Sequence, residues 1–100
     1  MRMDRRANMA RLAPADNVAV ALSDIAAGEM ALDRGELMVT ARERIPQGHK
    51  IALRPIGIDQ PIIRFGMPVG LAKAAIDMGA LVHIHNVRSQ YLDNEVDHYE

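Results

Sequence analysis

The chain has 100 residues, a formal net charge of -1 and no cysteine. This length suits one small domain, and the lack of cysteine excludes disulfides, cysteine-ligated iron–sulfur clusters and cysteine-based zinc sites. The near-neutral charge and the presence of only 2 Tyr and 1 Phe argue against a nucleic-acid partner. No apolar run approaches the roughly 20 residues of a membrane-spanning helix, and no apolar segment follows the first arginines as in a secretory signal. We therefore expect a cytoplasmic protein with no membrane partner.

Charge and composition divide the chain into three parts. We expect an Arg-rich N-terminal extension at 1–13, a folded domain at 14–87 and a polar, acidic tail at 88–100. Because hydrophobic residues make up 49% of the chain and aromatic ones 3%, the core of the domain must be aliphatic.

Short apolar or alternating runs dominate the folded part and predict a mostly β fold. A single stretch, residues 71–78, favours a short helix that ends at Gly79. Strands are expected at 17–22, 37–41, 51–53, 61–65 and 82–87.

Four stretches share the pattern Ile-x-x-Gly-x-x-apolar, with Asp59 in place of Gly in the third. The pattern predicts one helical turn closed by a residue with positive φ, which Gly adopts without steric cost and Asp tolerates. The chain then leaves each turn as a strand, and the Ile is buried. Since the four are irregularly spaced, we interpret them as tight corners, not as a solenoid repeat. They begin at Ile25, Ile45, Ile56 and Ile76.

The strand predicted at 82–87 carries two histidines. Alternation would place His83 and His85 on one face, roughly 6–7 Å apart along the strand. Two imidazoles at this spacing can converge on a metal ion or an anionic substrate, although they could also decorate an exposed face. With His49 they would make three neutral imidazoles, enough for a metal site with open positions.

Three further residues are candidates for substrate binding. Lys50 follows His49 at a tight corner and could hold a carboxylate or phosphate as a point charge, or be solvated. Arg64 could be a surface charge or a carboxylate fork. Asn86 could cap a turn or hydrogen-bond a substrate hydroxyl.

Several of these motifs occur together in one known family. A Gly-His-Lys corner, an Arg-aromatic-Gly-x-Pro-x-Gly turn and a His-x-His-Asn strand follow one another in the order and spacing of that family. The region from about Pro14 to Val87 resembles the N-terminal SAF domain of the altronate and galactarate dehydratases. It is also similar to the small subunit of sulfolactate sulfo-lyase. The stretches that carry the resemblance are 16–22, 45–53, 63–70 and 82–87.

The resemblance implies a β-clip (SAF-like) fold and a part in a lyase that dehydrates hydroxylated sugar acids with a divalent metal, Fe2+ or Mn2+. It also implies a larger catalytic subunit or domain as the partner, without which we expect no activity; the acidic tail favours a stand-alone subunit over an excised domain. His83 and His85 are then the metal or acid/base candidates, with His49 as a further metal ligand. Lys50 is the carboxylate anchor, and His49, Arg64 and Asn86 complete the substrate-binding set.

Two other functions remain open on the sequence. In the sulfo-lyase alternative, sulfite leaves the substrate in place of water. In the other, the chain is a non-catalytic carbohydrate-binding or docking module. Such a module would not need both the Gly-His-Lys and the His-x-His-Asn motifs, and it could form a homo-oligomer.

Overall fold

Short antiparallel strands joined by tight turns make up the fold. The computed structural model describes residues 7–35, 37–83 and 85–88, and these residues contain nine strands and no helix. No described segment is therefore a helix long and apolar enough to cross a membrane. The mostly β prediction is confirmed. The strands are β1 (Met9–Ala10), β2 (Val18–Ala21), β3 (Met30–Leu32), β4 (Met38–Thr40), β5 (Lys50–Ala52), β6 (Pro61–Arg64), β7 (Met67–Ala72), β8 (Leu81–Val82) and β9 (Val87–Arg88).

The helix predicted at 71–78 is wrong. Residues 71 and 72 finish β7, and the remainder turns through an isolated bridge at Ile76 to reach Gly79. The Ala-rich composition of this stretch favours a helix locally, but the backbone of Ile76 pairs reciprocally with that of Ile56. Tertiary pairing therefore overrides the local propensity.

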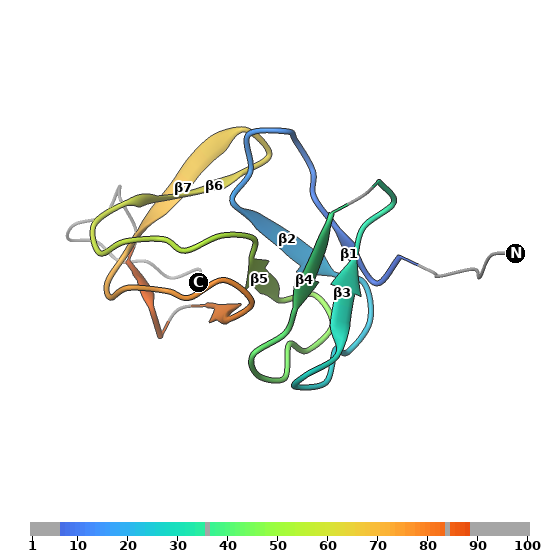
Figure 1. The fold of residues 1–100 in the computed structure, drawn as a ribbon. Helices are drawn as coiled ribbons and strands as arrows, with labels where there is room; N and C mark the ends of the chain where they lie inside the picture. Colours follow the sequence, from blue (N-terminus) through green and yellow to red (C-terminus); the bar gives the residue numbers. More distant parts are fainter. Residues whose placement is uncertain (1–6, 36, 84, 89–100) are drawn as a thin grey trace, which may run out of the picture.

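The strands form three small sheets around a central pair of strands. One sheet has the order β1-β2-β5-β8, a second consists of β3 and β4, and a third has the order β6-β7-β9, all antiparallel. The β3–β4 hairpin and the β6–β7 hairpin extend from opposite sides of β2 and β5 (Figure 1).

The four Ile motifs are built alike and pair with each other in twos. Each unit runs from a buried Ala through Ile to a residue with positive φ, and we call it a corner unit. In the first pair, the Gly28 N–H donates to the Ala41 carbonyl, and the Gly48 N–H donates to the Ala21 carbonyl. Ile25 and Ile45 exchange backbone hydrogen bonds in the middle. The four corner units are residues 21–28, 41–48, 52–59 and 72–79.

The second pair of corner units repeats the first. Asp59 donates to Ala72 and Gly79 donates to Ala52, around the bridge between Ile56 and Ile76. The residues that close the units have φ between 68° and 88°, as predicted for Gly and Asp. The closing turn itself is a four-residue β-turn, such as the one in which the Glu29 N–H donates to the Ala26 carbonyl, and not the predicted helical turn.

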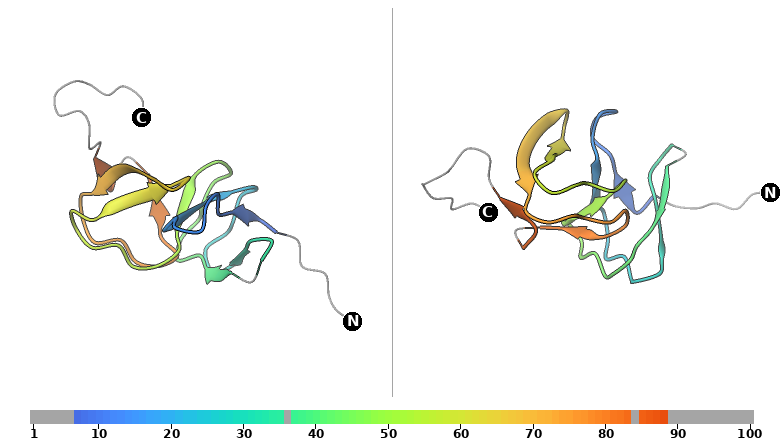
Figure 2. Two further views of the ribbon diagram at one scale, coloured as in Figure 1. Left: turned by 90° about the horizontal axis from the view of Figure 1, so that it is seen from above. Right: turned by 60° about the vertical axis from the view of Figure 1, so that its left-hand side comes forward.

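Two aliphatic clusters form the core, one under each pair of corner units. Ile25 and Ile45 belong to the first cluster, and Ile56 and Ile76 to the second. The sheet of β2, β5 and β8 separates the clusters, with Ile51 facing the first. The buried apolar residues include no aromatic side chain, which agrees with the aliphatic core expected from composition. Figure 2 shows the two halves on either side of the central strands.

Candidate functional site

His49 and His83 are in contact at the end of the β5–β8 pair. The antiparallel register pairs Ile51 with Leu81 and Lys50 with Val82. One further step along this register sets His49 opposite His83, and the two ring centroids lie 4.4 Å apart with the planes tilted by 39°. The sequence motifs Gly-His-Lys and His-x-His therefore meet through strand pairing, although more than thirty residues separate them.

The corner units show why the His49 side chain is available for this contact. At the matching position of two other units, Glu29 accepts a hydrogen bond from the Ala26 N–H, and Gln60 accepts one from the Gly57 N–H, each at 2.8 Å. In the unit of His49 the residue to be capped is Pro46, which has no N–H. The side chain at position 49 therefore has no role in closing its own turn.

His49 is half-buried, and its Nδ1 is inaccessible to solvent without a hydrogen-bond partner among the described residues. An unsatisfied buried nitrogen costs folding free energy, about 1–3 kcal/mol. A nitrogen of this kind is typical of a site that is completed by a ligand or a partner.

The strand predicted at 82–87 is broken, so His83 and His85 do not share a strand face. β8 ends at Val82, residues 85 and 86 form a turn, and β9 begins at Val87. His85 is exposed on this turn. Ile84, which the alternation placed towards the core, lies outside the described residues.

Asn86 holds the turn that carries His83. Its Oδ1 accepts the His83 N–H at 2.9 Å, and its Nδ2 donates to the Leu81 carbonyl at 2.8 Å. The Asn86 N–H donates to the His83 carbonyl, which closes the turn. Of the two alternatives for Asn86, the turn cap is confirmed, and its amide orients the backbone of His83.

Two cations lie near each other on the other face of the β5–β8 pair from the histidine rings, because Lys50 alternates with His49 along the strand. Lys50 is half-buried on β5 and Arg64 is exposed at the end of β6. Burial, and to a lesser extent the positive charge of Arg64, lower the pKa of Lys50 below its ordinary value of 10.5. In the part of the chain that the structure describes, neither cation forms an ion pair. A carboxylate or phosphate would relieve this uncompensated charge.

Asp16 is a buried polar residue whose role the sequence did not indicate. Its carboxylate accepts the N–H of Gly66 at 2.7 Å, of Phe65 at 2.8 Å and of Ala13 at 3.1 Å. Burial alone would raise the pKa of Asp16, but these backbone N–H groups, with that of Leu12, bring it below its ordinary value of 3.8. Asp16 thereby fixes the tip of the β6–β7 hairpin, directly after Arg64.

Comparison with known proteins places this geometry in a family. Residues 7–90 match the model of the altronate/galactarate dehydratase SAF domain. The chain belongs to this family. The match includes both histidines of the ring pair, both cations and Asp16.

Relatives of this SAF domain are mostly much longer proteins. The chain is 42% identical over 86 residues to an altronate dehydratase of Escherichia coli, and the match covers 85% of this chain and 17% of that enzyme. It is 36% identical over 84 residues to an altronate dehydratase of Bacillus subtilis, again covering 17% of the enzyme. The chain thus spans about a sixth of the length of these relatives, which makes it similar to one module of a larger enzyme.

One relative is of similar size to the SAF domain. The chain is 30% identical over 76 residues to the alpha subunit of a (2R)-sulfolactate sulfo-lyase of Chromohalobacter salexigens, covering 71% of this chain and 81% of that subunit. The module therefore occurs in the family both as part of a long enzyme and as a separate subunit.

The described residues do not by themselves form a metal site. Among the described residues there is no group of three or more His, Asp or Glu arranged to hold a metal ion. The His49–His83 pair supplies two imidazoles, one with an unpartnered buried nitrogen. Two imidazoles are of the ligand type that transition metals take, but are fewer than the three protein ligands of a catalytic metal site.

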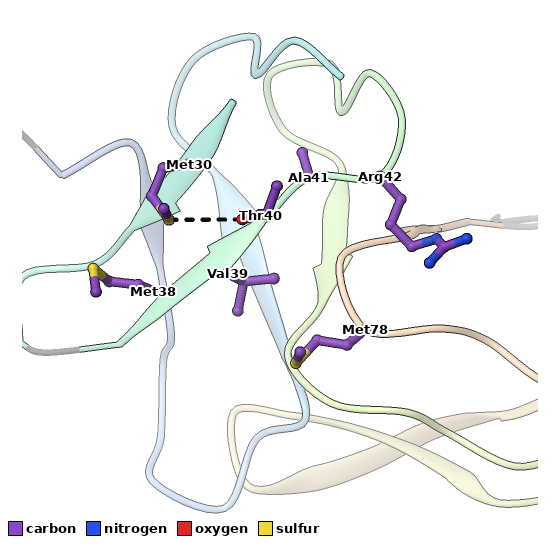
Figure 3. A pocket seen from close by; sticks show the side chains of 7 residues that line it. All are labelled: Met30, Met38, Val39, Thr40, Ala41, Arg42 and Met78. Atoms are coloured by element: carbon purple, nitrogen blue, oxygen red, sulfur yellow. Dashed lines mark hydrogen bonds between the residues drawn. The ribbon is translucent and has the colours of Figure 1, made fainter. Parts of the chain in front are cut away.

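A shallow hollow also lies on the surface of the SAF domain. Its volume is about 510 Å³, and it is formed largely by the β3–β4 hairpin and by Met78 from the fourth corner unit (Figure 3). Its lining residues are Met30, Met38, Val39, Thr40, Ala41, Arg42 and Met78.

Proposed function

We propose that this SAF domain acts with a larger lyase polypeptide to dehydrate a hydroxylated sugar acid of the altronate or galactarate type, and that it adopts the β-clip fold. The observation that carries the proposal is the contact between His49 and His83 in a member of this family. Two cations, Lys50 directly after His49 in the chain and Arg64 near Lys50, form no ion pair among the described residues. The module is small and His49 and His83 are only half-buried, so we assign completion of the site to the larger polypeptide.

The proposed reaction takes a proton from the carbon next to the substrate carboxylate and expels the β-hydroxyl. The carbon–hydrogen bond electrons form the new double bond, the carbon–oxygen bond breaks, and the leaving hydroxide takes up a proton as water. The resulting enol becomes the keto acid. A positioned imidazole can serve as the base or the acid in such a step, and contributes roughly 10²–10⁴-fold.

The cations of the SAF domain are assigned to the substrate carboxylate. Lys50 and Arg64 would hold it as an anion. Burial of Lys50 strengthens this attraction because the surrounding dielectric is lower than that of water.

A divalent cation, Fe2+ or Mn2+, is assigned to the completed site, with His83 and His49 as ligands and His85 as a third candidate. Such an ion would acidify the α-proton and assist departure of the hydroxyl. Asn86 acts here as a positioning residue, because it holds the backbone of His83.

A second candidate function is supported by one comparison. The chain covers 81% of a sulfo-lyase alpha subunit, so the same site could serve a substrate from which sulfite leaves instead of water. The carboxylate anchor would be the same in both reactions, because (2R)-sulfolactate and the sugar acids are all carboxylates.

The test is turnover by the assembled enzyme. The chain is mixed with the larger lyase polypeptide and Fe2+ or Mn2+, and altronate, galactarate and (2R)-sulfolactate are assayed in parallel. We expect turnover of a sugar acid only in the mixture, and a loss of at least about 100-fold with His83→Ala or His49→Ala. Arg34→Gln, at an exposed cation in the turn of the β3–β4 hairpin, is the matched control. Unchanged turnover in both histidine variants would show that the catalytic assignment is wrong, and turnover of sulfolactate alone would favour the second function.

A further inference from the structure

The corner unit 41–48, which leads to His49, has a carboxylate at a position where the other three units have none. Its third residue is Glu43, and the third residues of the other units are Ser23, Arg54 and Ala74. All four units close through equivalent backbone hydrogen bonds, so the corner does not need a carboxylate at this position. The Glu43 side chain is therefore available for a contact outside its own unit.

Glu43 contacts the edge of β8. Its Oε2 accepts the N–H of Leu81 at 3.0 Å. Beside this bond, the Arg42 N–H donates to the Gly79 carbonyl at 2.9 Å. Two hydrogen bonds thus join the start of the corner unit 41–48 to the segment that enters β8.

The outer edge of β8 is held by side chains instead of a neighbouring strand. The backbone of the residue before Leu81 bonds inwards to β5. Because hydrogen bonds alternate in direction along an antiparallel strand, the N–H and C=O groups of Leu81 and His83 point outwards. On this side Glu43 accepts the Leu81 N–H, while the Asn86 amide takes the Leu81 carbonyl and the His83 N–H.

These restraints act on the contact between His49 and His83. β8 is two residues long, and its register with β5 consists of two residue pairs. Any shift of so short a strand would move the His83 ring from its position 4.4 Å from the His49 ring, centroid to centroid. Asn86 restrains the chain after His83, and Glu43 restrains it before His83.

We propose that Glu43 is a positioning residue that keeps the His83 imidazole against His49. This inference rests on the proposed function, in which the two imidazoles act on the substrate. A displacement of about 1 Å at a reacting group can cost about 100-fold in rate. Glu43 is exposed, and water can replace it as the acceptor of the Leu81 N–H, so its loss should change the geometry of the site more than the stability of the fold.

The test compares two changes at Glu43 with one at Glu29. Glu43→Ala removes the acceptor, whereas Glu43→Gln keeps an amide oxygen that can accept the same N–H. Glu29→Ala is the matched control, because Glu29 is also exposed and its carboxylate accepts a backbone N–H at 2.8 Å in closing the first corner. The nuclear Overhauser effect between the rings of His49 and His83 and the hydrogen exchange of the Leu81 N–H are measured by NMR on the chain alone. The values of kcat and KM are measured on its mixture with the larger lyase polypeptide.

We expect Glu43→Ala to speed exchange of the Leu81 N–H, to weaken the Overhauser effect between the rings and to lower kcat about tenfold with little change in KM. Glu43→Gln and Glu29→Ala should behave like wild type in all three measurements. An unchanged ring contact in Glu43→Ala, or an equal loss in Glu43→Gln or Glu29→Ala, would overturn the positioning role. If the wild-type mixture shows no turnover, the proposed function is overturned, and the ring contact in Glu43→Ala alone decides whether Glu43 positions His83.

Discussion

At position 49, the side chain has no structural role in its own turn and can therefore make other contacts. The equivalent side chains Glu29 and Gln60 close their own turns by accepting a backbone N–H. Pro46 removes that N–H in the unit of His49, and the imidazole instead stacks on His83.

We expect that the turn-closing role can be restored at the cost of activity. In a double-mutant cycle, Pro46→Ala supplies the N–H and His49→Gln supplies the acceptor. The two changes should be favourably coupled by about 1 kcal/mol in the free energy of unfolding, measured in urea. Glu29→Ala, which removes the natural cap of the first unit, should cost a similar amount. Additive changes in the cycle would show that no cap forms at this corner.

Lys50 is a second residue whose surroundings set a chemical property, the pKa of its ammonium group. Arg64→Gln should raise the pKa of Lys50, because it removes a neighbouring positive charge, while burial continues to hold that pKa below 10.5. The chain has two lysines, Lys50 and Lys73, so ¹³C-dimethylation gives two lysine signals to titrate by NMR, besides the signal of the α-amino group. No movement of the Lys50 signal in the variant would show that Arg64 does not act on it.

Among elements, the corner unit decides most of the structure. Gly28 and Gly79 close equivalent units with φ of 87° and 88°. A Cβ at Gly28 would meet no atom within 4 Å, whereas a Cβ at Gly79 would overlap the Thr40 carbonyl oxygen.

The two glycines therefore separate conformational strain from steric overlap. Gly28→Ala should lower the free energy of unfolding by about 1–2 kcal/mol through its positive φ alone. Gly79→Ala should cost about 1–3 kcal/mol more, because the backbone at Thr40 has to move. Urea unfolding of the two variants measures both values, and equal losses would mean that the contact at Thr40 yields without cost.

The corner units were partly readable in the sequence. Glycine at fixed distance from isoleucine predicted the positive φ, and Asp59 fits as the tolerated substitute. The pairing was missed, although Ile25 and Ile45 have the same separation as Ile56 and Ile76. That regularity would have shown that residues 72–79 pair with residues 52–59, which excludes the helix.

The site was less readable, because it depends on pairing between distant segments. Alternation placed His83 and His85 on one face, but it cannot show that Asn86 ends the strand by capping a turn. The contact between His49 and His83 follows from the β5–β8 register, which no local pattern specifies. Asp16 was missed for the same reason, since its partners Phe65 and Gly66 lie far along the chain.

At the scale of the whole molecule, Asp16 makes the stability of the fold depend on pH. Because the pKa of Asp16 is lowered in the folded state, its ionised form stabilises the fold above pH 3.8, and that contribution is lost as the pH falls through the folded-state value. Asp16→Asn should therefore lower stability at pH 7, by roughly 1–3 kcal/mol, and flatten the decline in acid. Thermal unfolding from pH 7 to pH 2 measures both effects.

The control for this experiment is Asp77→Asn. Asp77 forms an exposed ion pair with Arg42 at 3.6 Å, and such pairs contribute little, up to about 1 kcal/mol. If both variants show the same acid profile as wild type, a group other than Asp16 governs the acid transition.

The fourfold use of one corner has a consequence for how this module can change over generations. Its folding depends on backbone hydrogen bonds, a buried Ile and a closing Gly or Asp, and the residue that follows the closing position is Glu29, His49, Gln60 or Ala80 in turn. Natural variation can therefore explore that position at the cost of no more than a turn-closing side-chain hydrogen bond. A lineage that needs a new reactive group has four equivalent places to try it, and three of them can keep the old architecture intact meanwhile.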